Sequence, residues 1–115
     1  MLPAASRLKN PKQYKLVLKK GRKAQTFFFV AQALPTKRAG EPQIGVVVSK
    51  TVSRKTIERN AVKRKTREVL RLFVVPFMGP GYDVVIRALP LSNGASFAQI
   101  KKDVIFLIRK LQLLP

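Results

Sequence analysis

The segment from residue 54 to residue 73 constrains the fold most, because it has helical spacing and no glycine or proline interrupts it before Pro76. On a helical wheel of about 100° per residue, one side carries the residues that should face a core: Val62, Thr66, Val69, Leu70 and Phe73. The adjacent side carries four cations and an amide, here called the basic stripe: Asn60, Lys63, Arg64, Arg67 and Arg71. The sequence therefore predicts a long helix with one side toward a core and the next toward an anion.

The basic stripe has an ordinary alternative, a solvated helix face, but such faces normally mix both signs of charge. The chain has 24 Lys and Arg against 5 Asp and Glu, so its formal net charge at pH 7 is +19. In so basic a chain, a stripe of one sign increases self-repulsion, and contact with a polyanion explains it better than solvation does. Nucleic acid is favoured over a membrane surface or an acidic protein, because it offers one charge per nucleotide along a continuous track.

Length and composition indicate a single domain over residues 1–115, since 46% apolar content is enough for one modest core. The chain has no cysteine, which excludes disulfides and thiolate metal sites and is compatible with a reducing cytoplasm. Its first ten residues lack the apolar core of a secretory signal, and no stretch approaches the roughly 18 apolar residues of a membrane span. We therefore expect a cytoplasmic protein with no membrane partner.

Two further helices are predicted from their end signals. Asn10 and Pro11 form a helix start, and Gly21 supplies the stop, so a short basic helix should cover residues 11–20. Ser96 and Gln99 form a capping box that begins a last amphipathic helix.

Three apolar segments predict strands, and turn residues separate them: 25–34, 43–49 and 82–88. The first two are expected to be antiparallel and joined by a polar loop over residues 35–42, and a turn at 79–82 should lead into the third. The resulting order is αββαβα, an α+β fold. Alternation places Phe27 and Phe29 on one side of the first strand and Phe28 on the other, and the sequence leaves open which side supplies the core.

The chain carries little that could perform catalysis by itself. It has no His and no Cys, and its five carboxylates form no metal-ligand pair at close spacing: Glu41, Glu58, Glu68, Asp83 and Asp103. Glu58 and Glu68 are about 15 Å apart along their helix, too far to share an ion. We therefore expect no catalytic side chain, no protein-bound metal and no other cofactor.

The residues around the basic stripe resemble a known family. Arg59-Asn60-Ala61-Val62-Lys63-Arg64, with Arg67-Glu68 after it and Ser49-Lys50 before it, is similar to the signature of the bacterial ribonuclease P protein family. Arg-Leu-Lys at 7–9, Lys-Lys-Gly at 19–21, the VVVSK strand and GYDVVIRA extend the resemblance over nearly the whole chain. Ala61 departs from the third residue of the usual Arg-Asn-Arg, and Thr51 from a frequent lysine. On the wheel, position 61 lies away from the basic stripe, so we expect this departure to cost little.

The resemblance implies an α/β sandwich with a left-handed strand-helix-strand crossover, in a subunit that assists a catalytic RNA. It implies that the chain binds ribonuclease P RNA through one set of side chains: Lys50, Arg54, Arg59, Asn60, Lys63, Arg64, Arg67 and Arg71. A second set would bind the 5′ leader of precursor tRNA: Lys12, Tyr14, Lys15, Phe27 and Phe29. The RNA would cleave the leader with its own Mg²⁺, with one protein expected per catalytic RNA.

Two other classes remain open at this point. Ribosomal and other structural RNA-binding proteins share the size and charge of this chain. A DNA-binding architectural protein is less favoured, because the sequence shows no evident pair of recognition helices and no dimer-forming heptads.

Overall fold

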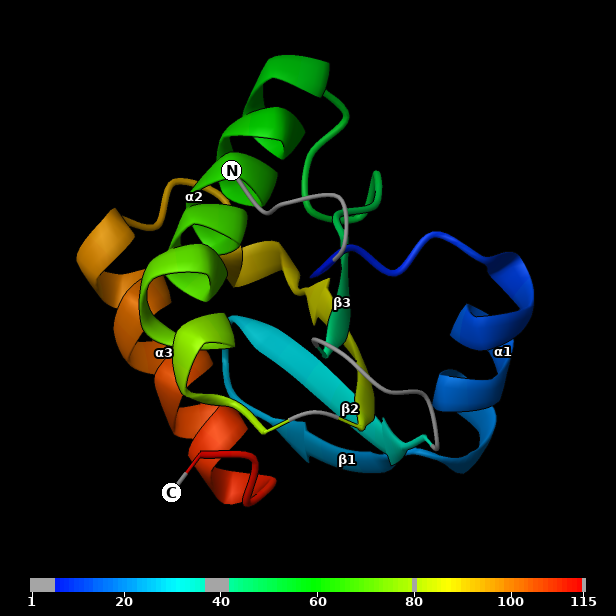
Figure 1. The fold of residues 1–115 in the computed structure, drawn as a ribbon. Helices are drawn as coiled ribbons and strands as arrows, with labels where there is room; N and C mark the ends of the chain where they lie inside the picture. Colours follow the sequence, from blue (N-terminus) through cyan, green and yellow to red (C-terminus); the bar gives the residue numbers. More distant parts are fainter. Residues whose placement is uncertain (1–5, 37–41, 80, 115) are drawn as a thin grey trace.

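The computed structural model describes residues 6–36, 42–79 and 81–114, which form a four-stranded sheet between helices (Figure 1). The helices are α1 (Pro11–Lys20), α2 (Thr56–Phe73) and α3 (Phe97–Lys110), with short 3-10 turns at Val75–Phe77 and Pro90–Ser92. The strands are β1 (Arg22–Gln25), β2 (Phe29–Pro35), β3 (Gln43–Val47) and β4 (Tyr82–Ala88). The element order is thus αβββαβα, an α+β sandwich with one strand more than the sequence predicted.

The extra strand is β1, which lies almost wholly before the predicted strand over 25–34, and a turn at Thr26 joins it to β2 in a hairpin. The Thr26 N–H donates to the Phe29 carbonyl at 2.9 Å, and the Thr26 hydroxyl accepts from the Phe29 N–H at 3.2 Å. The side chain of Thr26 thus stabilises a turn in a segment that has no glycine or proline from which the turn could be predicted. Because the chain reverses here, Phe27 and Phe29 do not share one side of a strand, and the expected alternation is wrong.

The sheet is mixed, in the order β1-β2-β4-β3. β4 is antiparallel to β2 and parallel to β3, with Ala33 opposite Val84 and Ile44 also opposite Val84. β2 and β3 therefore run in opposite directions, as expected, but they do not pair, because β4 lies between them. The predicted loop over residues 35–42 lies mostly outside the described residues, as does Pro80 in the predicted turn.

The two faces of the sheet carry cores of different size. α2 and α3 cover one face, where alternate residues of β4 such as Val84 and Ile86 join the main cluster. α1 covers the other face and packs Val17 against Val85 in a smaller cluster (Figure 1). The predicted apolar side of α2 faces the main core, since Val62, Thr66, Val69 and Leu70 are buried and Phe73 is partly buried.

The predicted start and stop of α1 and the predicted start of α3 are confirmed. The Asn10 side chain accepts from the Lys12 N–H at 2.9 Å, and α1 ends at Lys20. A side chain could not replace the hydrogen of Gly21, because a Cβ there would lie 2.6 Å from the Val17 carbonyl oxygen. At α3 both hydrogen bonds of the Ser96–Gln99 capping box are present.

Candidate nucleic-acid interface

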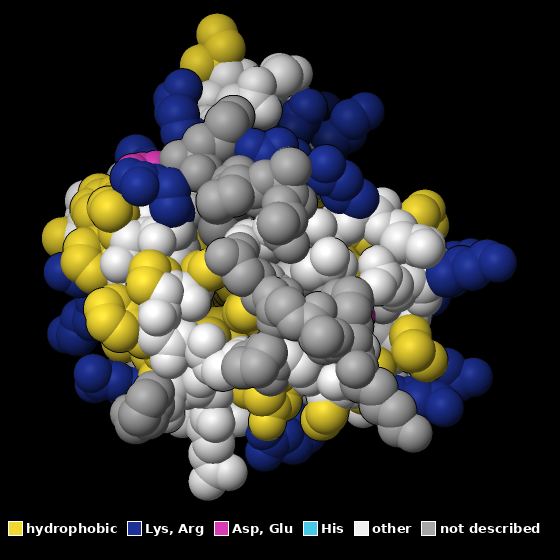
Figure 2. Space-filling view, viewed as in Figure 1, with side chains coloured by type: hydrophobic (Ala, Val, Ile, Leu, Met, Phe, Trp, Pro, Cys, Tyr) yellow, Lys and Arg dark blue, Asp and Glu magenta, His cyan; other side chains and the backbone are white. Residues whose placement is uncertain are grey.

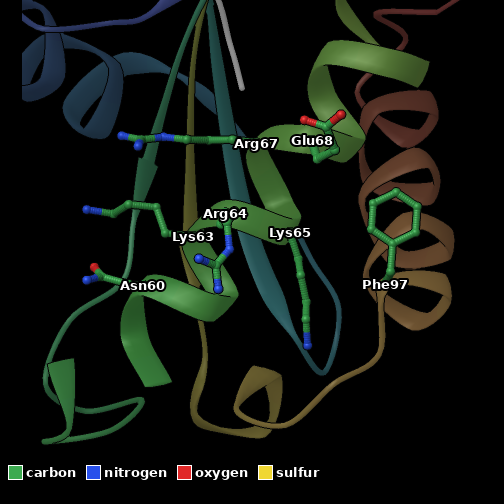
Figure 3. A pocket seen from close by; sticks show the side chains of 7 residues that line it. All are labelled: Asn60, Lys63, Arg64, Lys65, Arg67, Glu68 and Phe97. Carbon is green, nitrogen blue, oxygen red and sulfur yellow. The ribbon is translucent and has the colours of Figure 1, made fainter. Parts of the chain in front are cut away.

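The middle of the basic stripe lines one groove of about 580 Å³ on the outer surface of α2. Asn60, Lys63, Arg64 and Arg67 all contribute, with Lys65, Glu68 and Phe97 completing the lining. In Figure 3 the side chains of Asn60, Lys63 and Arg67 point to one side of α2, whereas Lys65 points to the other, toward α3. Within the described residues, the structure shows no hydrogen bond or ion pair for Lys63, Arg64 or Arg67. Their charges are therefore available to an anion.

Two predicted RNA-contacting arginines have partners inside the protein. Arg59 donates from Nη1 to the carbonyls of Ser53 and Arg54, both at 3.0 Å, and from Nη2 to the Thr56 hydroxyl at 3.2 Å. Arg71 pairs with Glu68 on the same helix. That pair holds the pKa of Glu68 at about 2 and raises the pKa of Arg71. The arginines at the two ends of the cationic surface, Arg59 and Arg71, are thus already bonded within the protein. The cations of the basic stripe that lie between them are not, within the described part of the chain.

The loop before α2 presents the remaining predicted cations. Lys50 and Arg54 are exposed there, and the loop is held at its end by Glu58. The Glu58 carboxylate accepts from the Ser53 hydroxyl at 2.6 Å and from the Asn93 amide at 3.3 Å, and these hydrogen bonds lower its pKa. Glu58 and Arg59 together fix the loop from both sides of the helix start. Around this end of α2, Lys and Arg side chains gather at the surface (Figure 2).

On the α1 side of the sheet, Tyr14 lies on the backbone of β3. A Cβ at Gly45 would overlap the Tyr14 hydroxyl and lie 2.7 Å from Cε1, so glycine is required for this contact. Burial raises the pKa of Tyr14, and the positive charge of Arg67 partly opposes the rise. The charge of Arg67 on α2 thus acts electrostatically on a side chain of α1.

The five predicted leader-binding residues do not come together. Lys12 and Lys15 are exposed and Tyr14 is half-buried, all on α1. Phe29 is 0% exposed and belongs to the main core, so its ring has no free face for a base and the expectation for this residue is wrong. Phe27 is 82% exposed but lines a groove with residues of α3, away from α1. The prediction from alternation was wrong for Phe27 and Phe29 because the turn at Thr26 interrupts the strand.

Two polar residues on the α1 side of the sheet, Gln32 and Arg87, were not predicted from the sequence. Gln32 donates from Nε2 to the Leu18 carbonyl at 3.1 Å, and its Oε1 accepts from Arg87 Nη2 at 3.5 Å. The Nε of Arg87 is buried with no hydrogen-bond partner within the described residues. The sequence did contain a signal, because Arg87 is a charged residue between Ile86 and Ala88 in a mostly apolar strand.

The described residues contain no group of three or more Asp, Glu, His or Cys side chains that could hold a metal ion. None of the helices in this part of the chain is long and apolar enough to cross a membrane. Asp83 is buried in β4, while Asp103 lies on α3 and accepts from the Thr26 hydroxyl, so these two carboxylates are on different elements.

Comparison with known proteins places these features in a family. The family model "Ribonuclease P" matches residues 2–112. A ribonuclease P protein component of Beutenbergia cavernae is 38% identical over 104 residues, covering 90% of this chain and 86% of that protein. The corresponding protein of Corynebacterium diphtheriae is 34% identical over 110 residues, covering 90% of this chain and 91% of that one.

Solved structures agree with the fold. The ribonuclease P protein of Staphylococcus aureus superposes with a TM-score of 0.85 at 21% identity, covering 96% of this chain and 99% of that one. The protein from Thermotoga maritima gives a TM-score of 0.76 at 25% identity, covering 90% and 96%. The family match decides against the ribosomal and architectural alternatives that composition left open. The chain belongs to the bacterial ribonuclease P protein family and is a protein subunit of the holoenzyme that matures the 5′ ends of tRNA.

Proposed function

We propose that the chain acts as one RNA-binding domain that docks on ribonuclease P RNA through the groove on α2. The observation that carries this proposal is the placement of Lys63, Arg64 and Arg67 in one groove without protein partners in the described residues. Such cations gain binding free energy from phosphates through release of counterions, and an exposed amide such as that of Asn60 can add a hydrogen bond. Lys50 and Arg54 extend the same surface along the loop before α2.

The α1 side of the sheet is proposed to bind the 5′ leader of precursor tRNA. Lys12 and Lys15 supply exposed charge, and Tyr14 supplies a half-buried ring whose position is fixed by Gly45. Arg87 adds a guanidinium on the same side of the sheet, where its Nη2 donates a hydrogen bond to Gln32 Oε1 at 3.5 Å. Aromatic rings with nearby cations are the usual means of holding single-stranded RNA.

The chemistry of cleavage is assigned to the RNA, with Mg²⁺ bound by the RNA. The protein would contribute by reducing repulsion between the phosphates of the two RNAs, so that less Mg²⁺ is needed for the same rate. One copy is proposed per catalytic RNA, acting in the cytoplasm.

The docking proposal is tested by charge reversal in a reconstituted holoenzyme. Arg64→Glu should weaken binding to the catalytic RNA by at least about tenfold and raise the Mg²⁺ concentration needed for half-maximal cleavage. Arg109→Glu makes the same change of charge on α3, outside the groove, and serves as the matched control. Equal losses for the two variants would mean that net charge rather than the groove determines binding.

The leader proposal needs a different readout. Lys15→Glu should weaken binding of a precursor tRNA with a leader, while binding of the mature tRNA, which has none, stays the same. A loss of equal size for both tRNAs would contradict a contact to the leader.

A further inference from the structure

A second groove lies on the other face of the sheet from α1, between the β1–β2 hairpin and α3. It has a volume of about 680 Å³ and is lined by residues from the hairpin turn and from the outer side of the helix: Thr26, Phe27, Lys102, Asp103, Phe106 and Lys110. None of the α2 residues proposed to dock on ribonuclease P RNA lines this second groove. Over α3, hydrophobic and basic side chains lie next to one another at the surface (Figure 2).

The two phenylalanines in this groove expose much of their rings to water. Phe27 is 82% exposed and Phe106 is 54% exposed. A single exposed apolar residue is ordinary, but each exposed ring forgoes about 25 cal/mol for every Å² that burial would remove from water. Phe27 occupies a hairpin turn and Phe106 the solvent side of α3, where a polar residue would serve the fold as well. Two rings lining one groove therefore indicate a ligand with flat apolar faces.

The groove also has the charge of an anion site. Lys102, Phe106 and Lys110 are spaced four residues apart, so they follow one another along one side of α3, and Lys110 Nζ lies 5.9 Å from the centre of the Phe106 ring. The one carboxylate of the groove, on Asp103, accepts a hydrogen bond from the Thr26 hydroxyl. Lys101 differs from its neighbour, because its Nζ lies 4.0 Å from the ring centre of Phe73.

We propose that this groove is a second RNA contact, which binds one or two unpaired nucleotides of a single-stranded segment. Bases would stack on Phe27 and Phe106, and phosphates would lie near Lys102 and Lys110. This pairing of rings with ammonium groups is how proteins hold single strands without reading their sequence. A second copy of this chain is a poor occupant, because two chains of formal charge +19 repel each other. Since the sheet separates this groove from α1, the proposal does not rest on the leader contact.

The chain contains no tryptophan, so a single tryptophan can report on the groove alone. In F106W, titration with a hexauridylate should quench the fluorescence to saturation. Two phosphate contacts predict a roughly sevenfold weaker affinity when the salt is raised from about 50 to about 200 mM. The matched control is F77W, because Phe77 is 60% exposed but does not line this groove, and its fluorescence should change little.

Further variants in the F106W background separate the possible causes. Lys102→Glu should weaken the quenching titration at least about tenfold, whereas Lys101→Glu, its neighbour outside the groove, should change it less than about threefold. Tyr14→Ala should leave the titration unchanged, since it acts on the other face of the sheet. Circular dichroism confirms that each variant is folded.

Three results would overturn the proposal. The first is unchanged F106W fluorescence at concentrations where the anisotropy of a labelled hexauridylate reports binding. The second is loss of quenching in the Tyr14→Ala variant, which would place the bound strand on the α1 side. The third is a fluorescence change that depends on protein concentration without RNA, which would identify the groove as a contact between copies.

Discussion

Tyr14 of α1 lies directly on Gly45 of β3, with no room for a side chain at position 45. Gly45→Ala must therefore push the ring off the sheet or move α1. We expect a loss of about 1–3 kcal/mol in the free energy of unfolding, as for other overpacked sites, measured by urea denaturation. Gly79→Ala is the control, because nothing lies within 4 Å of a Cβ there. Equal stability of the two variants would show that Tyr14 is not held against β3.

Arg59 and Arg64 are predicted to act differently although both belong to the family-like signature. Arg59→Ala removes two hydrogen bonds to the loop before α2 and one to Thr56 at the start of the helix, and should lower the free energy of unfolding by about 1–2 kcal/mol. Arg64→Ala should change it by less than about 0.5 kcal/mol while weakening binding to the catalytic RNA. Urea denaturation and RNA titration of both variants separate the two roles. An unchanged stability of Arg59→Ala would assign Arg59 to RNA contact alone.

The Glu68–Arg71 pair predicts a pH dependence. The pKa of Glu68 falls from its usual 4.5 to about 2 in the folded protein, so the ionised carboxylate favours folding. This contribution is fully present above the unfolded-state pKa and disappears as the pH falls through about 2. The stability difference between the wild-type protein and Glu68→Gln should therefore shrink steadily from about pH 5 downward. A difference that stays constant over this range would exclude the pair as its source.

Glu68→Gln should also strengthen RNA binding, because it removes a negative charge from the groove and releases Arg71. We expect a gain of a few-fold in affinity for the catalytic RNA at low salt, decreasing as salt is raised. Binding measured at two salt concentrations tests this. Weaker binding by the variant would mean that Glu68 itself contacts the RNA complex.

Restoring the family's usual arginine at position 61 should have little effect. Ala61 is half-buried on α2 and does not line the groove with Lys63 and Arg64. Ala61→Arg is therefore expected to tighten binding to the catalytic RNA by no more than about twofold in a direct titration. A gain of tenfold or more would show that the RNA contacts a different side of α2.

Local signals predicted the helices well. The caps at Asn10 and Ser96 act within three residues, so the sequence contains all the information that sets these helix ends. The apolar side of α2 followed from its spacing alone. The position of β4 between β2 and β3 could not be predicted, because strand order depends on contacts between distant segments. A left-handed crossover was an expectation from the family resemblance only, since general rules favour the opposite hand.

The candidate site was predictable as a surface but not residue by residue. Spacing brought Lys63, Arg64 and Arg67 to one side of α2, and the structure places them in one groove. Spacing could not show that Arg59 donates to backbone carbonyls of its own loop, since these come from an irregular segment. Phe27 and Phe29 were misassigned for a related reason, because a threonine turn separates them without a sequence signal.

The central position of β4 has a consequence for biosynthesis. β4 is the strand that pairs with both β2 and β3. The β1–β2 hairpin and β3 therefore cannot join into one sheet until residues 82–88 have left the ribosome. By then α2 has already emerged with its cations exposed, next to the ribosome's own RNA. The nascent chain therefore carries the basic stripe of α2 before the sheet that supports this helix is complete. Completion of the sheet depends on β4, the last of the described strands to be made.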